Sequence, residues 1–237
     1  MFFADIHIHA LAGVDDGPSD EEEMFAMIDE AYDQGVRAIC FTPHWYPVSF
    51  GNNSEKALAA FDLAKSYILA KKVKMYLFLG NELRYSNGAA DWLRDGSCRR
   101  LNRTRFVLVD FSSGERCEDM IDGVRNILNI GYKPVFAHIE RYPDIGKDLK
   151  AIEALRSSGI KIQLDAGSVL GRFGLACKNR SLKLLSEGLA DIIASDAHGI
   201  EHRPILMKEA SELVSEKFGE DYAKRLFLVN PAELLIV

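Results

Sequence analysis

Short apolar runs rich in β-branched and aromatic residues alternate along the chain with longer amphipathic segments. Runs of this kind predict β-strands, and the amphipathic segments between them predict helices. The predicted strands are residues 3–8, 38–42, 75–79, 106–111, 134–137, 161–165 and 192–194. The predicted helices are residues 20–34, 54–72, 118–129, 149–158 and 181–187.

Glycines lie shortly before several predicted strands, where the preceding helix would end, namely Gly35, Gly131, Gly159 and Gly188. Glycine at these positions is typical of helix C-caps. The β–α alternation indicates parallel strands joined by crossover helices, and seven strands favour a closed barrel over an open sheet. No linker, repeat or low-complexity segment interrupts the pattern, so we predict one domain over residues 1–237.

The composition narrows the class of protein. Apolar residues make up 48% of the 237 positions, which is enough for a large core. The formal charge of −6 disfavours non-specific nucleic-acid binding, which needs many Lys and Arg contacts to phosphate. No apolar stretch approaches the ~18–20 residues of a membrane span, and the first residues lack a signal-peptide pattern. Four scattered cysteines without a CxxC pair favour a reduced, cytoplasmic protein: Cys40, Cys98, Cys117 and Cys177.

Histidines and acidic residues collect at the C-terminal ends of the predicted strands. Five of the six histidines lie there: His7, His9, His44, His138 and His198. Three acidic residues do so as well: Glu82, Asp110 and Asp196. In α/β barrels this end carries the active site, so the distribution predicts a functional cluster at one mouth of the barrel.

Two motifs space their polar side chains two residues apart. His7-x-His9 is on a strand, where alternate residues face the same side, so both imidazoles can reach one ion. Asp196-x-His198 repeats this spacing with a carboxylate and an imidazole. Exposed strand histidines and a helix-capping aspartate are the alternative interpretations. Asp110 interrupts an apolar run, and a charge there is rarely buried unless it is paired or bound to metal.

Single polar residues after the other strands are weaker signals. His44 after Thr42-Pro43, Glu82 after Gly80-Asn81 and the imidazole of His138 are each compatible with ordinary loops. Their coincidence on one face nevertheless predicts a metal site. Mixed imidazole and carboxylate ligands suit Mn, Fe or Zn, and the sequence offers no thiolate set for a structural zinc.

The motifs resemble those of the PHP (polymerase and histidinol phosphatase) superfamily. They are Asp5-x-His7-x-His9, Val14-Asp15-Asp16-Gly17-Pro18, Thr42-Pro43-His44, Gly80-Asn81-Glu82, Ala137-His138-Ile139-Glu140-Arg141-Tyr142 and Ala194-Ser195-Asp196-Ala197-His198-x4-Arg203-Pro204. Within the superfamily they are similar to the bacterial manganese-dependent protein-tyrosine phosphatases of capsule and exopolysaccharide synthesis. This resemblance extends over nearly the whole chain and implies a distorted (β/α)7 barrel.

The resemblance also implies a centre of two or three divalent ions, with Mn favoured and Fe, Zn or Mg as alternatives. It assigns His7, His9, Glu82 and Asp196 to the first ion, Asp16, His44 and His198 to the second, and Glu82, Asp110 and His138 to the third. Asp110 stands where these phosphatases usually have Glu, which is one methylene longer. Residues 167–170 also lack a histidine that relatives often carry.

The implied mechanism is hydrolysis of a phosphomonoester. The ions lower the pKa of a bound water to about 7 and polarise the phosphoryl oxygens. Three divalent ions and four carboxylates leave a charge of +2 for a phosphate dianion. Arg141 and Arg203 lie next to predicted ligands and are expected to bind the phosphate. Both are therefore predicted to be catalytic and substrate-binding residues. Trp45, Tyr46, Phe50 and Tyr85 are a candidate aromatic rim, or else ordinary packing residues.

The expected function is therefore a cytoplasmic protein-tyrosine phosphatase. Its expected partner is a phosphotyrosyl protein, in particular a bacterial tyrosine kinase that regulates polysaccharide synthesis. One alternative is a small-molecule phosphomonoesterase such as a histidinol phosphatase. A metal-stabilised binding protein without turnover is another, although every expected ligand position is filled. A nuclease is disfavoured by the acidic charge.

Overall fold

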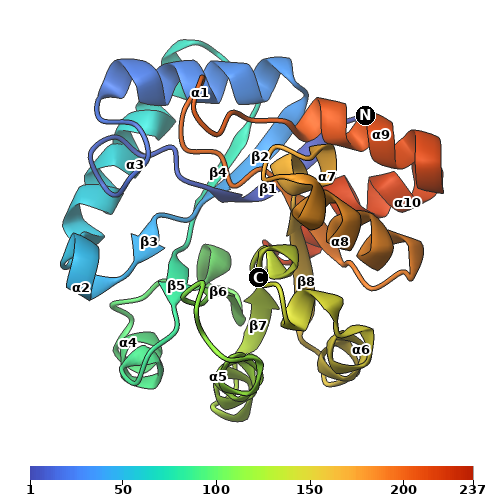
Figure 1. Ribbon diagram of the computed structural model, residues 1–237. Coiled ribbons are helices and arrows are strands. Elements are labelled where there is room, and N and C mark those ends of the chain that lie inside the picture. The colour runs from blue at the N-terminus through green and yellow to red at the C-terminus, as the bar shows by residue number, and fades with distance from the viewer. Residues whose placement is uncertain (237) are drawn as a thin grey trace.

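Parallel strands surround one axis, and helices surround the strands, in the computed structural model, which describes residues 1–236 (Figure 1). The strands are β1 (Phe3–Ile8), β2 (Val36–Phe41), β3 (His44–Trp45), β4 (Tyr76–Leu79), β5 (Glu82–Arg84), β6 (Phe106–Asp110), β7 (Lys133–Phe136), β8 (Lys161–Asp165) and β9 (Ile192–Ala194). They form two ladders, with strand orders β1-β2-β4 and β3-β5-β6-β7-β8-β9. Every one of these strand pairings is parallel.

The two ladders belong to one curled sheet. β3 continues the path of β2 after Pro43, which has no N–H for the ladder, and β5 continues that of β4 after Gly80 and Asn81. The Asn81 side chain stabilises this second break, because its amide donates to the Pro43 carbonyl over 2.9 Å. At the other edge, the Asp196 N–H donates to the His7 carbonyl over 2.8 Å. Seven strand positions therefore curl around one axis, which confirms the predicted α/β class and distorted barrel.

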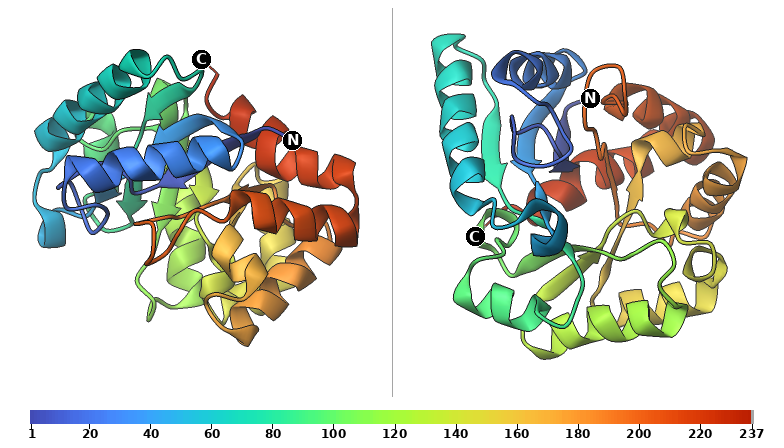
Figure 2. Two further views of the ribbon diagram at one scale, coloured as in Figure 1. Left: turned by 90° about the horizontal axis from the view of Figure 1, so that it is seen from above. Right: turned by 60° about the vertical axis from the view of Figure 1, so that its left-hand side comes forward.

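The helices lie outside the strands in all three views (Figures 1 and 2). The α-helices are α1 (Glu21–Asp33), α2 (Pro47–Phe50), α3 (Ser54–Ala70), α4 (Ala89–Asp95), α5 (Cys117–Asn129), α6 (Leu149–Ser157), α7 (Ala166–Leu170), α8 (Leu175–Ser186), α9 (Met207–Phe218), α10 (Glu220–Lys224) and α11 (Asn230–Glu233). Shorter turns are η1 (Leu101–Arg103), η2 (Ile139–Arg141), η3 (Ile145–Lys147) and the π-helix η4 (Arg225–Val229). All five predicted helices are present, although α8 begins six residues before the predicted start at 181.

Helix α1 shows how the sequence sets these elements. The Asp20 side chain accepts a hydrogen bond from the Glu23 N–H over 3.0 Å, and three glutamates occupy the first turn. Both features stabilise a helix N-terminus. The buried residues Met24, Met27, Ile28 and Ala31 follow helical spacing, so one face of α1 packs against the sheet.

The core inside the strands closes one end of the barrel. Its buried cluster contains Ile6, Cys40, Leu101, Leu108, Val135, Ala137, Ile192, Ala194, Leu234 and Leu235. Leu108 in this cluster and Asp110 beyond it lie on the same face of β6, because alternate strand residues face the same side. The apolar cluster therefore forms a floor, and polar side chains occupy the opposite mouth. Among the helices of residues 1–236, none has the length and apolarity needed to cross a membrane.

Candidate metal centre

The nine predicted ligands converge at the mouth of the barrel, at the C-terminal ends of the strands. They form four overlapping groups in which the ligand atoms lie within 4.8 Å of one another. The groups are His9, Asp16, His44 and His198; His7, His9 and Glu82; His7, His138 and Asp196; and His44, Glu82 and Asp110. The structure thus brings together all nine side chains that the sequence predicted as metal ligands, and they come from six segments that are distant along the chain.

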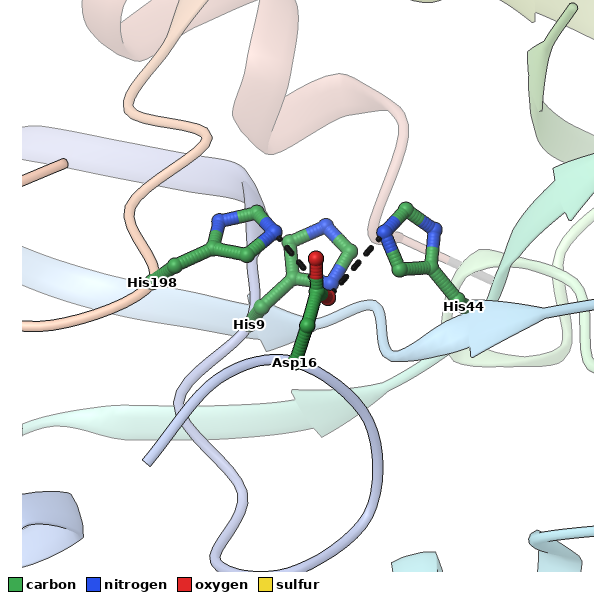
Figure 3. A group of neighbouring side chains, drawn as sticks. All are labelled: His9, Asp16, His44 and His198. Atoms are coloured by element: carbon green, nitrogen blue, oxygen red, sulfur yellow. Dashed lines mark ion pairs between the residues drawn. The ribbon is translucent and has the colours of Figure 1, made fainter. Parts of the chain in front are cut away.

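In the first group, the Asp16 carboxylate lies between the rings of His44 and His198, beside that of His9 (Figure 3). Asp16 Oδ1 lies 3.3 Å from His44 Nε2 and 3.4 Å from His198 Nε2. The ring of His9 stacks on that of His198 with centroids 4.0 Å apart. Asp16 comes from the loop after β1 and its side chain is half exposed, whereas His9 is fully buried. An ion held here would therefore be the one nearest to solvent.

Glu82 is the hub of the deeper groups. Its Oε1 lies 3.3 Å from His7 Nε2 and 3.0 Å from His138 Nε2. Its Oε2 lies 3.4 Å from His9 Nε2 and 2.8 Å from His44 Nδ1. Burial opposes the charge on this carboxylate, but the surrounding imidazoles outweigh it and hold the pKa of Glu82 well below its usual value. One carboxylate therefore contacts four imidazoles at the centre of the site.

Hydrogen bonds at the outer ring nitrogens fix the tautomers of the two β1 histidines. The His7 Nδ1–H donates to Gln163 Oε1 over 3.2 Å, and the His9 Nδ1–H donates to Asp15 Oδ2 over 2.7 Å. In a neutral ring this leaves the Nε2 lone pair free to bind metal. The two Nε2 atoms face each other 3.1 Å apart, so both lone pairs point into the same small space.

This arrangement fits a bound cation. Two facing lone pairs repel unless a proton or a metal ion lies between them. Glu82 Oε2 is also buried without a hydrogen bond of acceptable geometry among the described residues, although His44 Nδ1 is only 2.8 Å away. A divalent ion would satisfy these atoms together. The donor set of imidazoles and carboxylates is the one that Mn, Fe or Zn takes in proteins.

The surroundings of the cluster raise the pKa of some of its groups and lower that of others. Burial disfavours the charged form of His7, but Glu82 and Asp196 outweigh burial and raise its pKa to about 9. Burial and the Arg141 guanidinium lower the pKa of His138 to about 4, so this imidazole is neutral at pH 7. Burial and the charge of Glu82 raise the pKa of Asp110 to about 7, against the opposing effect of Arg84. Arg84 is therefore the cationic neighbour that favours the ionised form of Asp110.

Both predicted phosphate-binding arginines reach the site and converge on one oxygen. Arg141 Nη1 donates to Asp196 Oδ2 over 2.7 Å, and Arg203 Nη2 donates to the same oxygen. Arg203 Nη1 also donates to His198 Nε2 over 3.0 Å. The ring of Phe173 lies 4.8 Å from the Arg141 guanidinium and 5.9 Å from that of Arg203, within cation–π distance.

These groups surround an open cavity of about 500 Å³. Its lining includes six of the nine ligands, both arginines, Arg84, Cys177 and three aromatic residues, Phe111, Tyr142 and Phe173. The proposed rim of Trp45, Tyr46, Phe50 and Tyr85 is absent from this lining. Trp45 is buried in the core against Trp92, so its packing interpretation is correct. Phe50 stacks on the His44 ring instead, with centroids 5.4 Å apart.

Strained backbone marks the same site. Six non-glycine residues of the described chain have positive φ, and three of them are predicted site residues: His138 (33°), Asp196 (49°) and Arg203 (56°). The left-handed region is costly for residues with a Cβ and persists where surrounding contacts enforce it. This concentration of strain supports a functional rather than a purely structural role for the cluster.

The predicted third-ion ligands fall in two of the four groups, and Glu82 contacts a member of each. Asp110 joins His44 and Glu82, while His138 joins His7 and Asp196. Three residues that contact ligands were not predicted from the sequence: Asp15, Gln163 and Arg84. Asp15 could have been predicted as a contact of the ligands, because it is next to Asp16 in the sequence. Nothing in the sequence indicated Gln163, because an amide within an apolar strand resembles an ordinary buried polar residue.

Comparison with known proteins identifies the family. The sequence model of the family described as "Capsular polysaccharide synthesis, CpsB/CapC" matches residues 3–236. The tyrosine-protein phosphatase CpsB of Streptococcus pneumoniae is 33% identical over 239 residues, covering 98% of each chain. The tyrosine-protein phosphatase YwqE of Bacillus subtilis strain 168 is 29% identical over 232 residues, covering 98% of this chain and 91% of YwqE.

A solved structure extends the similarity to three dimensions. It comes from the crystal structures of YwqE from Bacillus subtilis and CpsB from Streptococcus pneumoniae, described as metal-dependent tyrosine phosphatases. It superposes with a TM-score of 0.89 at 28% identity and covers 98% of this chain and 94% of that chain. The sequence motifs, the barrel and the ligand cluster agree with these matches, and the chain belongs to the CpsB/CapC family of capsular polysaccharide synthesis proteins.

Proposed function

We propose that this chain is a metal-dependent protein-tyrosine phosphatase whose residues 1–237 form one phosphoesterase domain. The observation that carries the proposal is the convergence of nine imidazole and carboxylate ligands at one mouth of the barrel, where six of them and two arginines line an open cavity. Such a cavity accepts an anion beside bound cations. The activities named for CpsB and YwqE support the same assignment.

The nine ligands would hold two or three divalent ions, for which we favour Mn, with Fe, Zn or Mg as alternatives. Asp16, His44 and His198 would hold the outer ion, and His7, His9, Glu82 and Asp196 a deeper one. Asp110 and His138 complete the set. When bound, such ions polarise phosphoryl oxygens and activate a water molecule for attack.

The chain's own residues position the phosphate. The guanidinium groups of Arg141 and Arg203 are held by Asp196 and by the Phe173 ring, so they face the cavity in fixed orientations. Arginine binds phosphate oxygens through paired N–H donors, and the transferred phosphoryl group develops negative charge in the transition state. We propose that the two side chains bind these oxygens and orient the phosphorus for attack.

The substrate proposed here is a phosphotyrosyl protein. A tyrosyl leaving group has a pKa of about 10, so it departs without a strong general acid. Phe173 lines the cavity beside both arginines and offers an aromatic face for the tyrosyl ring. We further propose a cytoplasmic location and a bacterial tyrosine kinase of polysaccharide synthesis as the partner.

A comparison of two substrates tests this proposal against the small-molecule alternative. We expect kcat/KM for a phosphotyrosyl peptide to exceed that for histidinol phosphate by at least about tenfold, because only the former has an aromatic leaving group of low pKa. Both substrates are assayed with the same Mn²⁺-loaded protein. A preference for histidinol phosphate would instead favour a small-molecule phosphomonoesterase.

A further inference from the structure

Asp110 differs from the other acidic ligands in what its two oxygens contact. Arg84 Nε donates to Asp110 Oδ1 over 3.0 Å, and Arg84 Nη2 lies 2.8 Å from Asp110 Oδ2. Both carboxylate oxygens are therefore engaged by one planar guanidinium. Bidentate pairs of this kind are stronger and more directional than single contacts. In the fourth ligand group, the carboxylate therefore has both oxygens in contact with a guanidinium.

The other carboxylates keep an oxygen for a metal ion. Both arginine contacts to Asp196 are made with Oδ2, while Oδ1 lies 3.2 Å from His7 Nε2 and 3.5 Å from His9 Nε2. Asp16 and Glu82 have imidazoles as their neighbours and no arginine contact within the described residues. Asp110 alone among the four acidic ligands has both oxygens bound by a guanidinium.

The pairing of Arg84 with Asp110 follows from strand register. β5 and β6 are hydrogen-bonded parallel neighbours, and Arg84 and Asp110 are register partners. Side chains at register partners lie on the same face of a sheet, within reach of each other. The guanidinium is held further by Tyr46, whose ring centroid lies 5.4 Å from it. The contact therefore follows from the pairing of two adjacent strands.

Burial makes this ion pair persistent. The Asp110 side chain is 3% exposed and that of Arg84 is 25% exposed. An ion placed against Asp110 would have to displace the guanidinium from a buried carboxylate or lie beside its positive charge. Either route is costly, because like charges repel strongly where water is excluded.

The remaining lone pairs are enough for two ions. His7 and His9 each offer only Nε2, since their Nδ1 atoms are engaged by Gln163 and Asp15. The two groups that contain His7 therefore share one ion, and Asp16, His44 and His198 hold another. We propose that the Arg84 guanidinium takes the place of a third metal ion at Asp110, so that this chain binds two divalent ions. This inference rests on the metal centre of the proposed function.

The same placement gives Arg84 a role toward the substrate. Its side chain lines the cavity together with Arg141 and Arg203, so a third guanidinium faces the space where phosphate would bind. The single positive charge of the Arg84 guanidinium then occupies the place of an exchangeable divalent metal ion. Arg84 thus positions Asp110 and adds a third positively charged side chain to the lining of the proposed phosphate site.

Metal stoichiometry tests this inference without relying on activity. Metal-free protein is titrated with Mn²⁺ by calorimetry, and the ions retained after desalting are counted by mass spectrometry. We expect two ions per chain for the wild type. Arg84→Gln frees both oxygens of Asp110, so we expect a third ion, or a third site tightened by at least about tenfold.

Arg116→Gln is the matched control, because Arg116 pairs with Asp119 in the same bidentate manner at the exposed N-terminus of α5. We expect it to retain two ions. If Arg84→Gln does not fold, Arg84→Lys decides the question, since an ammonium leaves one oxygen of Asp110 free. A third ion is then expected at higher Mn²⁺ concentration.

Three outcomes contradict the inference in distinguishable ways. Three tightly bound ions in the wild type would show that Arg84 does not exclude the third. Two ions in a folded Arg84→Gln or Arg84→Lys protein at saturating Mn²⁺ would show that the guanidinium is not the cause of the exclusion. No bound ion in the wild type would overturn the metal centre itself, and with it the proposed function.

Discussion

Replacing Glu82 with glutamine should abolish most of the metal binding and the activity that depends on it. Glutamine preserves the shape of the side chain but removes the charge that contacts four imidazoles. Removing one partner from a buried charge cluster costs roughly 3–5 kcal/mol, which corresponds to a loss of about two to four orders of magnitude in affinity. We expect the dissociation constant for Mn²⁺ to rise by that factor and kcat/KM on a phosphotyrosyl peptide to fall with it.

Two comparisons separate this effect from a general loss of structure. Glu153→Gln on the exposed surface of α6 makes the same chemical change away from the site and should leave metal content unchanged. Asp16→Asn alters a ligand whose side chain is 51% exposed, so it spares the core and should lower the count by one ion. Full metal content in Glu82→Gln would show that this carboxylate is not a ligand.

Arg203→Ala should lower kcat/KM on phosphotyrosine while leaving the metals and the fold in place. Asp196 keeps its contact with Arg141 over 2.7 Å, so its orientation is retained. A charge-assisted hydrogen bond to phosphate contributes roughly 1.5–3 kcal/mol, so we expect a drop of about 10- to 150-fold. Alanine retains the Cβ, so the cost of the left-handed backbone at φ 56° is similar in both proteins.

The readout pairs metal counts with kinetics. Arg141→Ala should behave like Arg203→Ala, because both guanidinium groups face the same cavity. Arg125→Ala on the exposed face of α5 is the control and should retain wild-type kinetics. By contrast, His198→Ala should lower metal content as well as rate. Wild-type kinetics in Arg203→Ala would show that this arginine serves only to hold Asp196.

Much of the fold could be predicted because its signals are local. Apolar runs and helix periodicity report on neighbours along the chain, and three strands begin and end at the predicted residues: β1, β8 and β9. The breaks between β2 and β3 and between β4 and β5 were missed. The second break is stabilised by the Asn81 side chain bonding to Pro43, a contact across 38 residues that no periodicity records.

The sequence predicted which side chains meet at the candidate site. It did not predict which of them form hydrogen bonds or ion pairs with one another. Position at strand ends was enough to nominate His7, His44 and Glu82, because parallel strands deliver those ends to one mouth. The engagement of Asp110 by Arg84 needed the register of β5 against β6, which the sequence does not state. The same limit applies to Gln163, whose contact with His7 joins residues 156 apart.

Removal and restoration of metal test directly whether bound ions make this site a phosphatase. The purified wild-type protein is dialysed against excess EDTA, its residual metal is measured, and phosphotyrosyl-peptide hydrolysis is followed before and after Mn²⁺ is added. We predict that activity disappears with the metal and returns with Mn²⁺, because the proposed reaction needs bound ions to activate the attacking water and to polarise the phosphoryl oxygens. Full hydrolysis by protein verified to be metal-free would contradict the account.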